Sequence, residues 1–300
     1  MPLASIVTPG TLDVISVKTT SVVQHPVPQF DFISKSNSFG ISGNDGGHAL
    51  GASPRLQRLS IFATSGLEIS QIQIPYVNAS YELEFFAPAV SCSPAPASTV
   101  TRVTGWLGSI EGAVEPWLSF VPAKLGYVPS DFNPFDTSDT SGTTTFFGYG
   151  YNYDVGGNQS VSLFVSMDNG GSTYSSWPMV ECTLYNASYQ VNFQFTYPHQ
   201  NISVIQRTLH SAVLTPGDPN ATFGTPEWAY MNVMDAYANI LVGYTEGYGG
   251  GASSYRTMYQ VTALDSLSAT QGFDADQVIP ILETMFQNIT LSLLSDSSFQ

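Results

Sequence analysis

The chain has 300 residues, of which 43% are hydrophobic, so it can bury a sizeable core as one large domain or two small ones. Only 10% of the residues are charged, the formal net charge is −15, and Lys and Arg together number eight. This balance argues against a disordered chain and against nucleic acid as a partner, because no basic surface can neutralise phosphates. Ser, Thr, Asn, Gln, Gly and Tyr must supply the polar surface, a composition common in secreted and cell-wall proteins.

Segments in which apolar and polar residues alternate, rich in β-branched and aromatic side chains, predict strands. They cover residues 12–24, 58–64, 69–77, 81–88, 143–151, 160–167, 179–185, 188–196 and 201–209. Gly, Pro, Ser and Asp gather between them, at 42–47, 93–98, 129–142 and 168–178, and predict loops. The pattern therefore predicts a mainly antiparallel sheet system.

One short phrase occurs twice, as NASYELEFF at 78–86 and as NASYQVNFQF at 186–195. In each copy apolar residues alternate with polar ones, which predicts a strand with one buried face, entered from a surface turn. The flanking residues do not match, so the repeat gives little support for a duplicated domain. Glu82 and Glu84 share the other face of the first copy, where a solvated pair is favoured over a catalytic carboxylate pair.

Two amphipathic helices are predicted near the C-terminus, at about 226–243 and 275–294. Thr225 can cap the first, followed by Pro226 at its first position. Its apolar stripe comprises Tyr230, Met234, Tyr237 and Leu241, with Asn232, Asp235 and Asn239 opposite. The second begins after Asp274, and its stripe comprises Val278, Leu282, Met285, Ile289 and Leu293. Asn288 lies about 100° from the centre of that stripe, so we expect a glycan there to clear the core.

The N-glycosylation acceptor pattern Asn-x-Ser/Thr recurs along the chain, each time without proline in the middle. The acceptor residues are Asn78, Asn158, Asn186, Asn201, Asn220 and Asn288. Together with the sparse charge, these sequons indicate a protein of the secretory pathway.

The two cysteines, Cys92 and Cys182, are too few for a disulfide scaffold or a zinc site but enough for one bridge. Cys92 lies just past the strand begun by the first copy of the repeated phrase, and Cys182 lies four residues before the second copy. Two such strands side by side would bring the cysteines together. We predict a Cys92–Cys182 disulfide; the alternative is a pair of buried thiols.

The N-terminal sequence MPLASIVTPG has no cationic segment and only a short apolar run, which is unlike a signal peptide. No stretch reaches the roughly 18 apolar residues that a transmembrane helix needs. Because the sequons and the cysteines point to an oxidising compartment, we expect an extracellular or lumenal location, with the export signal supplied by sequence outside this chain.

Searches for reaction motifs assign no catalytic, metal-binding or cofactor-binding residue, and we expect no cofactor. The histidines show no H-E-x-x-H spacing, and G-x-S-x-G is absent. GYGGGA at 247–252 follows a predicted helix rather than a strand and is interpreted as a flexible loop. DTSDTSGT at 136–143 lacks the second copy that an aspartic protease needs. Aromatic clusters at 145–153 and 243–255 suit stacking on sugars, although strands burying alternate aromatics explain them better.

Several phrases together carry a family resemblance: VTPGTLDV, GASPRLQRLSIFATSGLEI, NASYELEFFAPAVSC, ECTLYNASYQVNF and LETMFQNITLSLLSD. They resemble the large non-cytoplasmic region of uncharacterised fungal multi-pass membrane proteins, some of which are labelled formylmethionine deformylase-like. The resemblance implies membrane association through flanking helices absent from this chain. It implies no deformylase activity, because the H-E-x-x-H helix and an E-G-C cysteine are both missing, and Cys182 directly follows Glu181.

Residues 1–300 are thus predicted to form a single α+β, mainly β ectodomain, with a sandwich-like antiparallel sheet system at about 12–210 and two C-terminal helices. The leading hypothesis is a non-enzymatic, glycosylated module for sensing, adhesion or organisation, with a cell-wall glycan or a protein as its ligand. The alternative is a secreted hydrolase acting on glycans. That enzyme would need two carboxyl groups about 5 Å or about 6.5–9.5 Å apart across an aromatic-lined cleft.

Overall fold

The computed structural model describes residues 21–22, 24, 27–42, 49–74, 76, 78–98, 100–101, 118–119, 160–167, 179–214, 225–241, 244–248, 251–255, 264 and 274–300. Within them, strands are about as prevalent as helices. The helices are α1 (Ser36–Phe39), α2 (Pro54–Ser65), α4 (Pro226–Leu241), α6 (Ala275–Ser292) and a 3-10 turn at Leu293–Ser295. The strands are β1 (Gly40–Ser42), β2 (Ala49–Ala52), β3 (Asn78–Pro94), β4 (Leu118–Ser119), β5 (Ser162–Met167), β6 (Met179–Thr196), β7 (His199–Ala212), β8 (Tyr244–Tyr248) and β9 (Gly251–Tyr255).

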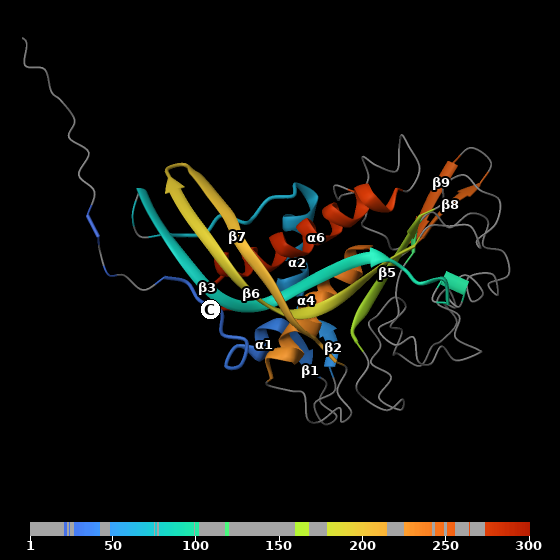
Figure 1. The fold of residues 1–300 in the computed structure, drawn as a ribbon, viewed down its shortest axis with the longest axis horizontal. Helices are drawn as coiled ribbons and strands as arrows, with labels where there is room; N and C mark the ends of the chain where they lie inside the picture. The colour runs from blue at the N-terminus through green and yellow to red at the C-terminus, as the bar shows by residue number, and fades with distance from the viewer. Residues whose placement is uncertain are drawn as a thin grey trace, which may run out of the picture.

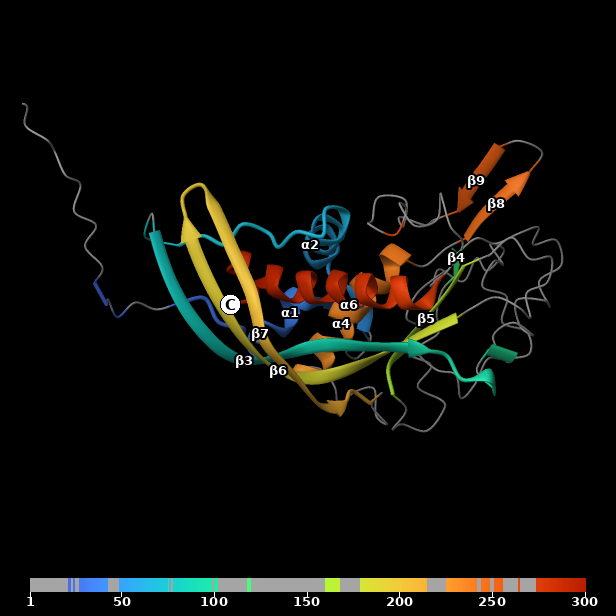
Figure 2. The same cartoon turned by 45° about the horizontal axis from the view of Figure 1, so that its top comes forward.

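The main sheet is antiparallel and is organised around β6. This strand pairs with β3 along its length on one side; on the other it pairs first with β5, which also pairs with β4, and then with β7. Figure 1 shows β3, β6 and β7 as long bent strands, and Figure 2 shows α6 on the concave side of β3 and β6 with α2 beyond it. The antiparallel sheet with helices is confirmed. A mainly β sandwich is not confirmed, because the layer facing this sheet in the described residues is helical.

The two copies of the repeated phrase pair with each other. In the register of β3 and β6, Tyr81 lies opposite Phe193, Leu83 opposite Val191 and Phe85 opposite Tyr189. The paired rings stack, with centroids 4.9 Å apart for Tyr81–Phe193 and 5.7 Å apart for Phe85–Tyr189. The first copy begins β3, but the second lies inside β6, so the prediction that each copy is entered from a turn is wrong for the second.

The buried face of β6 changes along the strand. Near its start the even-numbered Val180, Cys182 and Leu184 are buried, and from residue 187 onward the odd-numbered residues are buried, namely Ala187, Tyr189, Val191, Phe193 and Phe195. The break in the alternation is visible in the sequence and led to the prediction of two strands, 179–185 and 188–196. One continuous strand forms instead because its backbone keeps pairing with β3 while the core moves to the opposite face.

Helix α4 is buried nearly all round, so the prediction of an amphipathic helix is wrong. The predicted apolar stripe is buried, but the polar residues opposite are buried too: Asn232 is 1% and Asp235 3% exposed. The Asp235 carboxylate accepts hydrogen bonds from the Ala52 N–H at 2.6 Å and from the Asn239 amide at 3.2 Å. Asp235 therefore binds a neighbouring backbone N–H instead of water, and Asn232 donates to the Trp228 carbonyl of its own helix at 2.8 Å. Gly40 allows β1 to approach this helix, because a Cβ there would lie 2.5 Å from the Trp228 ring.

Helix α6 begins at the predicted cap, Asp274, and its predicted stripe is buried as expected. Phe286 on this helix packs edge-on against Tyr237 of α4, with ring centroids 5.4 Å apart. Asn288 is only 6% exposed, so the expectation that a glycan there would clear the core is wrong. Contrary to the expectation from the sequence, the segment Ala275–Ser295 is long and apolar enough to span a membrane, but 61% of its 18-residue apolar window is buried inside the fold.

Two predicted strands are absent. Residues 58–64 lie in α2. This helix is capped by Ser53, whose hydroxyl accepts the Leu56 N–H at 3.2 Å, and it has Pro54 in its first turn. Of the predicted strand at 69–77, residues 69–74, here called the strap, lie outside any strand, and residues 75 and 77 lie outside the described residues. Side chains from distant segments accept the backbone N–H groups of the strap: the Ile72 N–H donates to Gln200 at 2.9 Å, and the Ser70 N–H donates to Ser292 at 2.8 Å.

Two other predictions concern segments that the structure describes in part or not at all. The predicted loop at 247–252 contains the ends of a hairpin, because β8 pairs antiparallel with β9 from Tyr244 opposite Tyr255 to Tyr248 opposite Gly251. The predicted strand at 143–151, the aromatic cluster at 145–153 and most of the predicted strand at 12–24 lie outside the described residues.

Glu283 of α6 joins the helix to two strands. One carboxylate oxygen accepts the Cys92 N–H at 2.9 Å, and the other accepts from Arg207 at 2.7 Å. The side chains of Arg207 and Glu283 are each 22% exposed. Nearby, the Tyr189 and Thr290 hydroxyls both donate to the Pro88 carbonyl at 3.1 Å. Burial raises the pKa of Tyr189, so its hydroxyl stays a donor.

We expect Glu283→Ala to lower the free energy of unfolding by roughly 1–3 kcal/mol, because it leaves the half-buried guanidinium of Arg207 and the Cys92 N–H without their acceptor. Glu283→Gln is the control, because its amide oxygen can still accept one of these bonds. Urea unfolding of the three proteins measures the difference. Equal losses for the two variants would show that the charge and both acceptor oxygens are needed, whereas full stability of Glu283→Ala would contradict the prediction.

Candidate functional site

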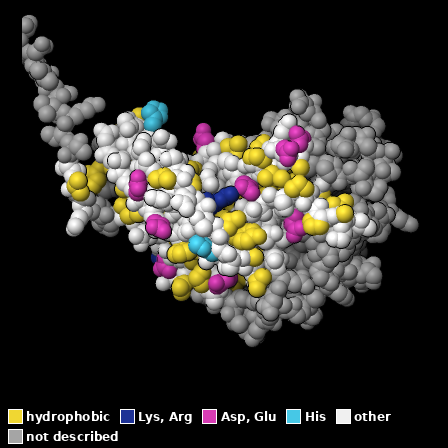
Figure 3. All heavy atoms as spheres, viewed as in Figure 1, with side chains coloured by type: hydrophobic (Ala, Val, Ile, Leu, Met, Phe, Trp, Pro, Cys, Tyr) yellow, Lys and Arg dark blue, Asp and Glu magenta, His cyan; other side chains and the backbone are white. Residues whose placement is uncertain are grey.

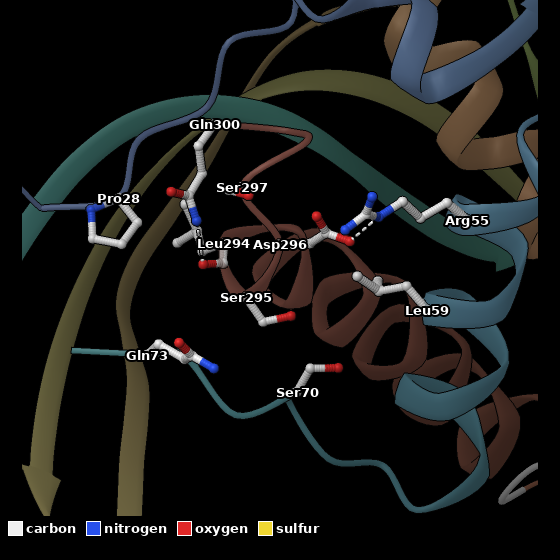
Figure 4. Close-up of a pocket in the computed structure, with 10 residues that line it drawn as sticks. All are labelled: Pro28, Arg55, Leu59, Ser70, Gln73, Leu294, Ser295, Asp296, Ser297 and Gln300. Carbon is white, nitrogen blue, oxygen red and sulfur yellow. Dashed lines mark hydrogen bonds and ion pairs between the residues drawn. The ribbon is translucent and has the colours of Figure 1, made fainter.

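Two adjoining hollows are the candidate sites in the described part of the chain, and Gln73 of the strap lines both. The larger, here called the C-terminal hollow, has a volume of about 540 Å³. Figure 4 shows its wall, which is formed by side chains of α2, of the strap and of the turn after α6. The lining residues are Pro28, Arg55, Leu59, Ser70, Gln73, Leu294, Ser295, Asp296, Ser297 and Gln300.

A hydrogen-bonded turn positions the polar groups of the C-terminal hollow. Asp296 accepts the Ser298 N–H at 2.9 Å through its side chain and the Phe299 N–H at 3.0 Å through its carbonyl. The Asp31 N–H donates to the Phe299 carbonyl at 3.0 Å, and the Gln300 amide donates to the Leu294 carbonyl at 2.8 Å. This turn places several hydroxyl and amide groups around one ion pair, an arrangement suited to a small polar ligand.

The ion pair of the C-terminal hollow joins Arg55 of α2 to Asp296. Burial acts to raise the pKa of Asp296, but hydrogen bonds from Ser298 and Arg55 outweigh it and lower that pKa below its usual value. Asp296 is therefore ionised at neutral pH. Arg55 is 56% exposed, so solvent screens the pair and its contribution to stability is small.

We expect Asp296→Asn to lower the free energy of unfolding by no more than about 1 kcal/mol at pH 7. The folded-state pKa lies below the unfolded one, so the contribution is complete above about pH 4 and is lost as the pH falls through the folded value. Unfolding titrations at several pH values measure this. A double-mutant cycle with Arg55→Ala isolates the pair, and a wild-type advantage that persists at pH 2 would contradict the assignment.

The second hollow, here called the tyrosine groove, lies between the strap and the turn that joins β6 to β7 and has a volume of about 320 Å³. Its lining residues are Gln71, Ile72, Gln73, Ile74, Tyr76, Phe195, Tyr197, Pro198 and His199. Tyr76 is 45% and Tyr197 78% exposed, whereas Phe195 is buried. The amide of Gln200 holds the strap against β7, donating to the Ile69 carbonyl at 2.8 Å while accepting from Ile72. The groove thus combines exposed rings with two exposed glutamine side chains.

The predicted disulfide is present. Cys92 lies directly opposite Cys182 in the register of β3 and β6, with an S–S distance of 2.01 Å and a Cα–Cα distance of 4.0 Å. Both cysteines are buried. A disulfide is consistent with an oxidising, extracellular or lumenal environment.

The predicted glycosylation sites differ in exposure. Asn78 and Asn201 are exposed. Asn186 is half-buried, and its amide oxygen accepts from the Tyr230 hydroxyl at 3.3 Å. Asn288 is buried, as described above, while Asn158 and Asn220 lie outside the described residues. Among the described acceptors, two therefore present an accessible amide.

The carboxylates that a glycan hydrolase would use are not brought together in either hollow. Asp296 is the one carboxylate among the lining residues of the C-terminal hollow, and the tyrosine groove has none. Glu82 and Glu84 are exposed on β3, as the favoured reading expected, and line neither hollow. Figure 3 shows acidic side chains scattered over the face of the molecule seen in Figure 1, with few basic side chains among them. Within the described residues, no group of three His, Cys, Asp or Glu could hold a metal ion.

Both hollows were missed in the sequence because each is built from segments far apart in the chain. The C-terminal hollow is lined by residues 28, 55–59, 70–73 and 294–300, and the tyrosine groove joins residues 71–76 to 195–199. The alternation Gln71-Ile72-Gln73-Ile74 was visible, and it predicted a strand rather than the wall of a groove.

No family model, curated protein or solved structure matches this chain.

Proposed function

We propose that this chain is a glycosylated, β-rich ectodomain on the extracellular or lumenal side of a membrane, serving as a non-enzymatic module for sensing, adhesion or organisation. The observation that carries the proposal is the Cys92–Cys182 disulfide, which links two directly opposed strand positions. Such bridges form and persist in oxidising compartments. The exposed sequon residues Asn78 and Asn201 support the same location.

The C-terminal hollow is the proposed recognition site of this module. Its hydroxyl and amide groups suit a small polar ligand, such as one residue of a cell-wall glycan or a polar side chain of a protein. Its aspartate is paired with Arg55, which favours binding over proton transfer. The fungal membrane-protein resemblance of the sequence fits this proposal, with the membrane anchor supplied by flanking helices.

The proposal is tested by expressing the chain with its native flanking sequence in a secreting eukaryotic cell. We expect export, glycan on Asn78 and Asn201, and no alkylatable thiol in non-reducing mass spectrometry. Protease protection of sealed vesicles should place the chain on the lumenal side. A cytosolic chain with two free thiols and no glycan would overturn the proposed function.

A further inference from the structure

The tyrosine groove presents two exposed rings beside a buried apolar floor. Tyr76, which follows the strap, and Tyr197, in the turn between β6 and β7, are both exposed. Ile72 and Phe195 also line the groove, and both are buried, so they form its floor. Two segments far apart in the chain thus bring two aromatic rings to one groove.

The groove is held in shape by the protein itself. The Gln200 side chain accepts the Ile72 N–H at 2.9 Å and donates to the Ile69 and Ser70 carbonyls at 2.8 and 3.2 Å. On the opposite wall, Phe195 stacks on Tyr81 of β3, with ring centroids 5.9 Å apart. A ligand therefore does not have to order the strap when it binds, which lowers the cost of binding.

The exposed glycosylation acceptors lie on the other face of the sheet. Phe195 and Gln200 are register partners, and both face the strap. Asn78 is opposite Thr196, which directly follows Phe195, and Asn201 directly follows Gln200. Because successive side chains of a strand point to opposite faces, glycans on these two residues would leave the groove open to a separate ligand.

The chemistry of the groove matches a neutral sugar. Tyrosine rings stack on the C–H faces of a sugar, and the exposed amides of Gln71 and Gln73 can each donate to and accept from its hydroxyls. A proline-rich peptide, which also docks in aromatic grooves, has few N–H groups and would leave the amide oxygens unused. The lining residues include no Asp, Glu, Lys or Arg, and the chain carries a net charge of −15, so an acidic glycan is disfavoured.

We propose that the tyrosine groove binds a neutral, β-linked oligosaccharide of glucose or N-acetylglucosamine, stacked on Tyr76 and Tyr197. The ring substituents of these sugars are equatorial, which leaves apolar C–H faces for the tyrosines. The groove volume of about 320 Å³ is within the range of small-molecule sites. Gln73 also lines the C-terminal hollow, where Figure 4 shows it, so the two hollows form adjoining parts of one recognition surface. This inference rests on the proposed function, because it names the glycan class that the recognition module takes.

Calorimetric titration of the secreted full chain tests the proposal, with chitotetraose and laminaritetraose as the neutral probes and tetragalacturonate as the acidic one. We expect binding of at least one neutral tetraose and none of tetragalacturonate. Tyr76→Ala and Tyr197→Ala should each weaken the binding by roughly three- to tenfold, whereas Tyr197→Phe keeps the ring and should retain it.

Phe86→Ala is the matched control, because Phe86 is 59% exposed but lines neither hollow. It should leave the affinity for the tetraose unchanged. Circular dichroism and urea unfolding of all variants establish that they are folded.

The failures of the two proposals are distinguishable. Absence of binding of both neutral tetraoses at millimolar concentration, or binding that both alanine variants retain, would overturn this inference while leaving the proposed function intact. Tighter binding of a decaproline peptide than of either tetraose would do the same, and so would an equal loss in Phe86→Ala. A cytosolic chain with two free thiols and no glycan would overturn the proposed function and this inference with it.

Discussion

Replacing Cys92 and Cys182 together by alanine should lower the free energy of unfolding by about 4–5 kcal/mol. The disulfide closes a loop with a sequence separation of 90, and in the chain-entropy model it restricts the unfolded chain by that amount. A typical domain has only about 5–15 kcal/mol in total, so we expect the variant to be secreted poorly. Urea unfolding of the wild type and the variant measures the loss.

Reduced wild-type protein is the control for this prediction. It should unfold at about the same urea concentration as the double variant, because both lack the cross-link and little else changes. A single Cys92→Ala variant should lose a similar amount and leave Cys182 open to alkylation once the chain is unfolded. A loss below about 1 kcal/mol for the double variant would show that the unfolded chain is already held compact by other contacts.

Phe286→Ala should lower the free energy of unfolding by about 3–5 kcal/mol. The side chain is completely buried between the helices, where its ring meets Tyr237 edge-on. Truncation removes the buried surface and leaves a cavity, and both effects are unfavourable. Tyr237 is anchored by a 3.0 Å bond from its hydroxyl to the Leu282 carbonyl, so it cannot move easily to fill the space.

Phe62 is the matched control for Phe286. It lies in the last turn of α2 and is 55% exposed, so Phe62→Ala should change the stability by less than about 0.5 kcal/mol. Thermal and urea unfolding of both variants would measure the contrast. Comparable losses at the two positions would mean that the exposed face of α2 is covered in the folded protein.

The strands and helices that the sequence predicted well are those in which the apolar residues of the pattern lie on the face that the fold buries. The alternation of exposed and partly buried residues holds in β3 up to Phe86 and in β7 up to Ile205, where the pairing with β6 shifts its register, and α6 carries a 3.6-residue stripe behind an aspartate cap. The disulfide followed from the same reasoning, because two long strands of similar length brought the cysteines opposite each other. These features depend on local periodicity, which a single sequence contains.

The failures have a tertiary cause. Helix α2 buries small residues such as Ser60 and Ala63 and exposes Phe62, so the order of apolar residues along its sequence does not mark its buried face. Helix α4 is surrounded on several sides, so even Asn232 and Asp235 are buried. Neither the strap nor the hollows could be predicted, because their walls are set by side chains such as Gln200 and Ser292 from distant segments.

The pairing of the repeated phrase with its own second copy makes the two segments mutually complementary. Two chains could satisfy the same pairing by exchange, each giving residues 78–86 to the partner's 188–196. The disulfide settles that choice. Once Cys92 and Cys182 of one chain are bonded, β3 and β6 of that chain are covalently linked, and the chain can no longer exchange β3 with a second copy. Oxidation thus specifies a monomeric sheet as well as stabilising it.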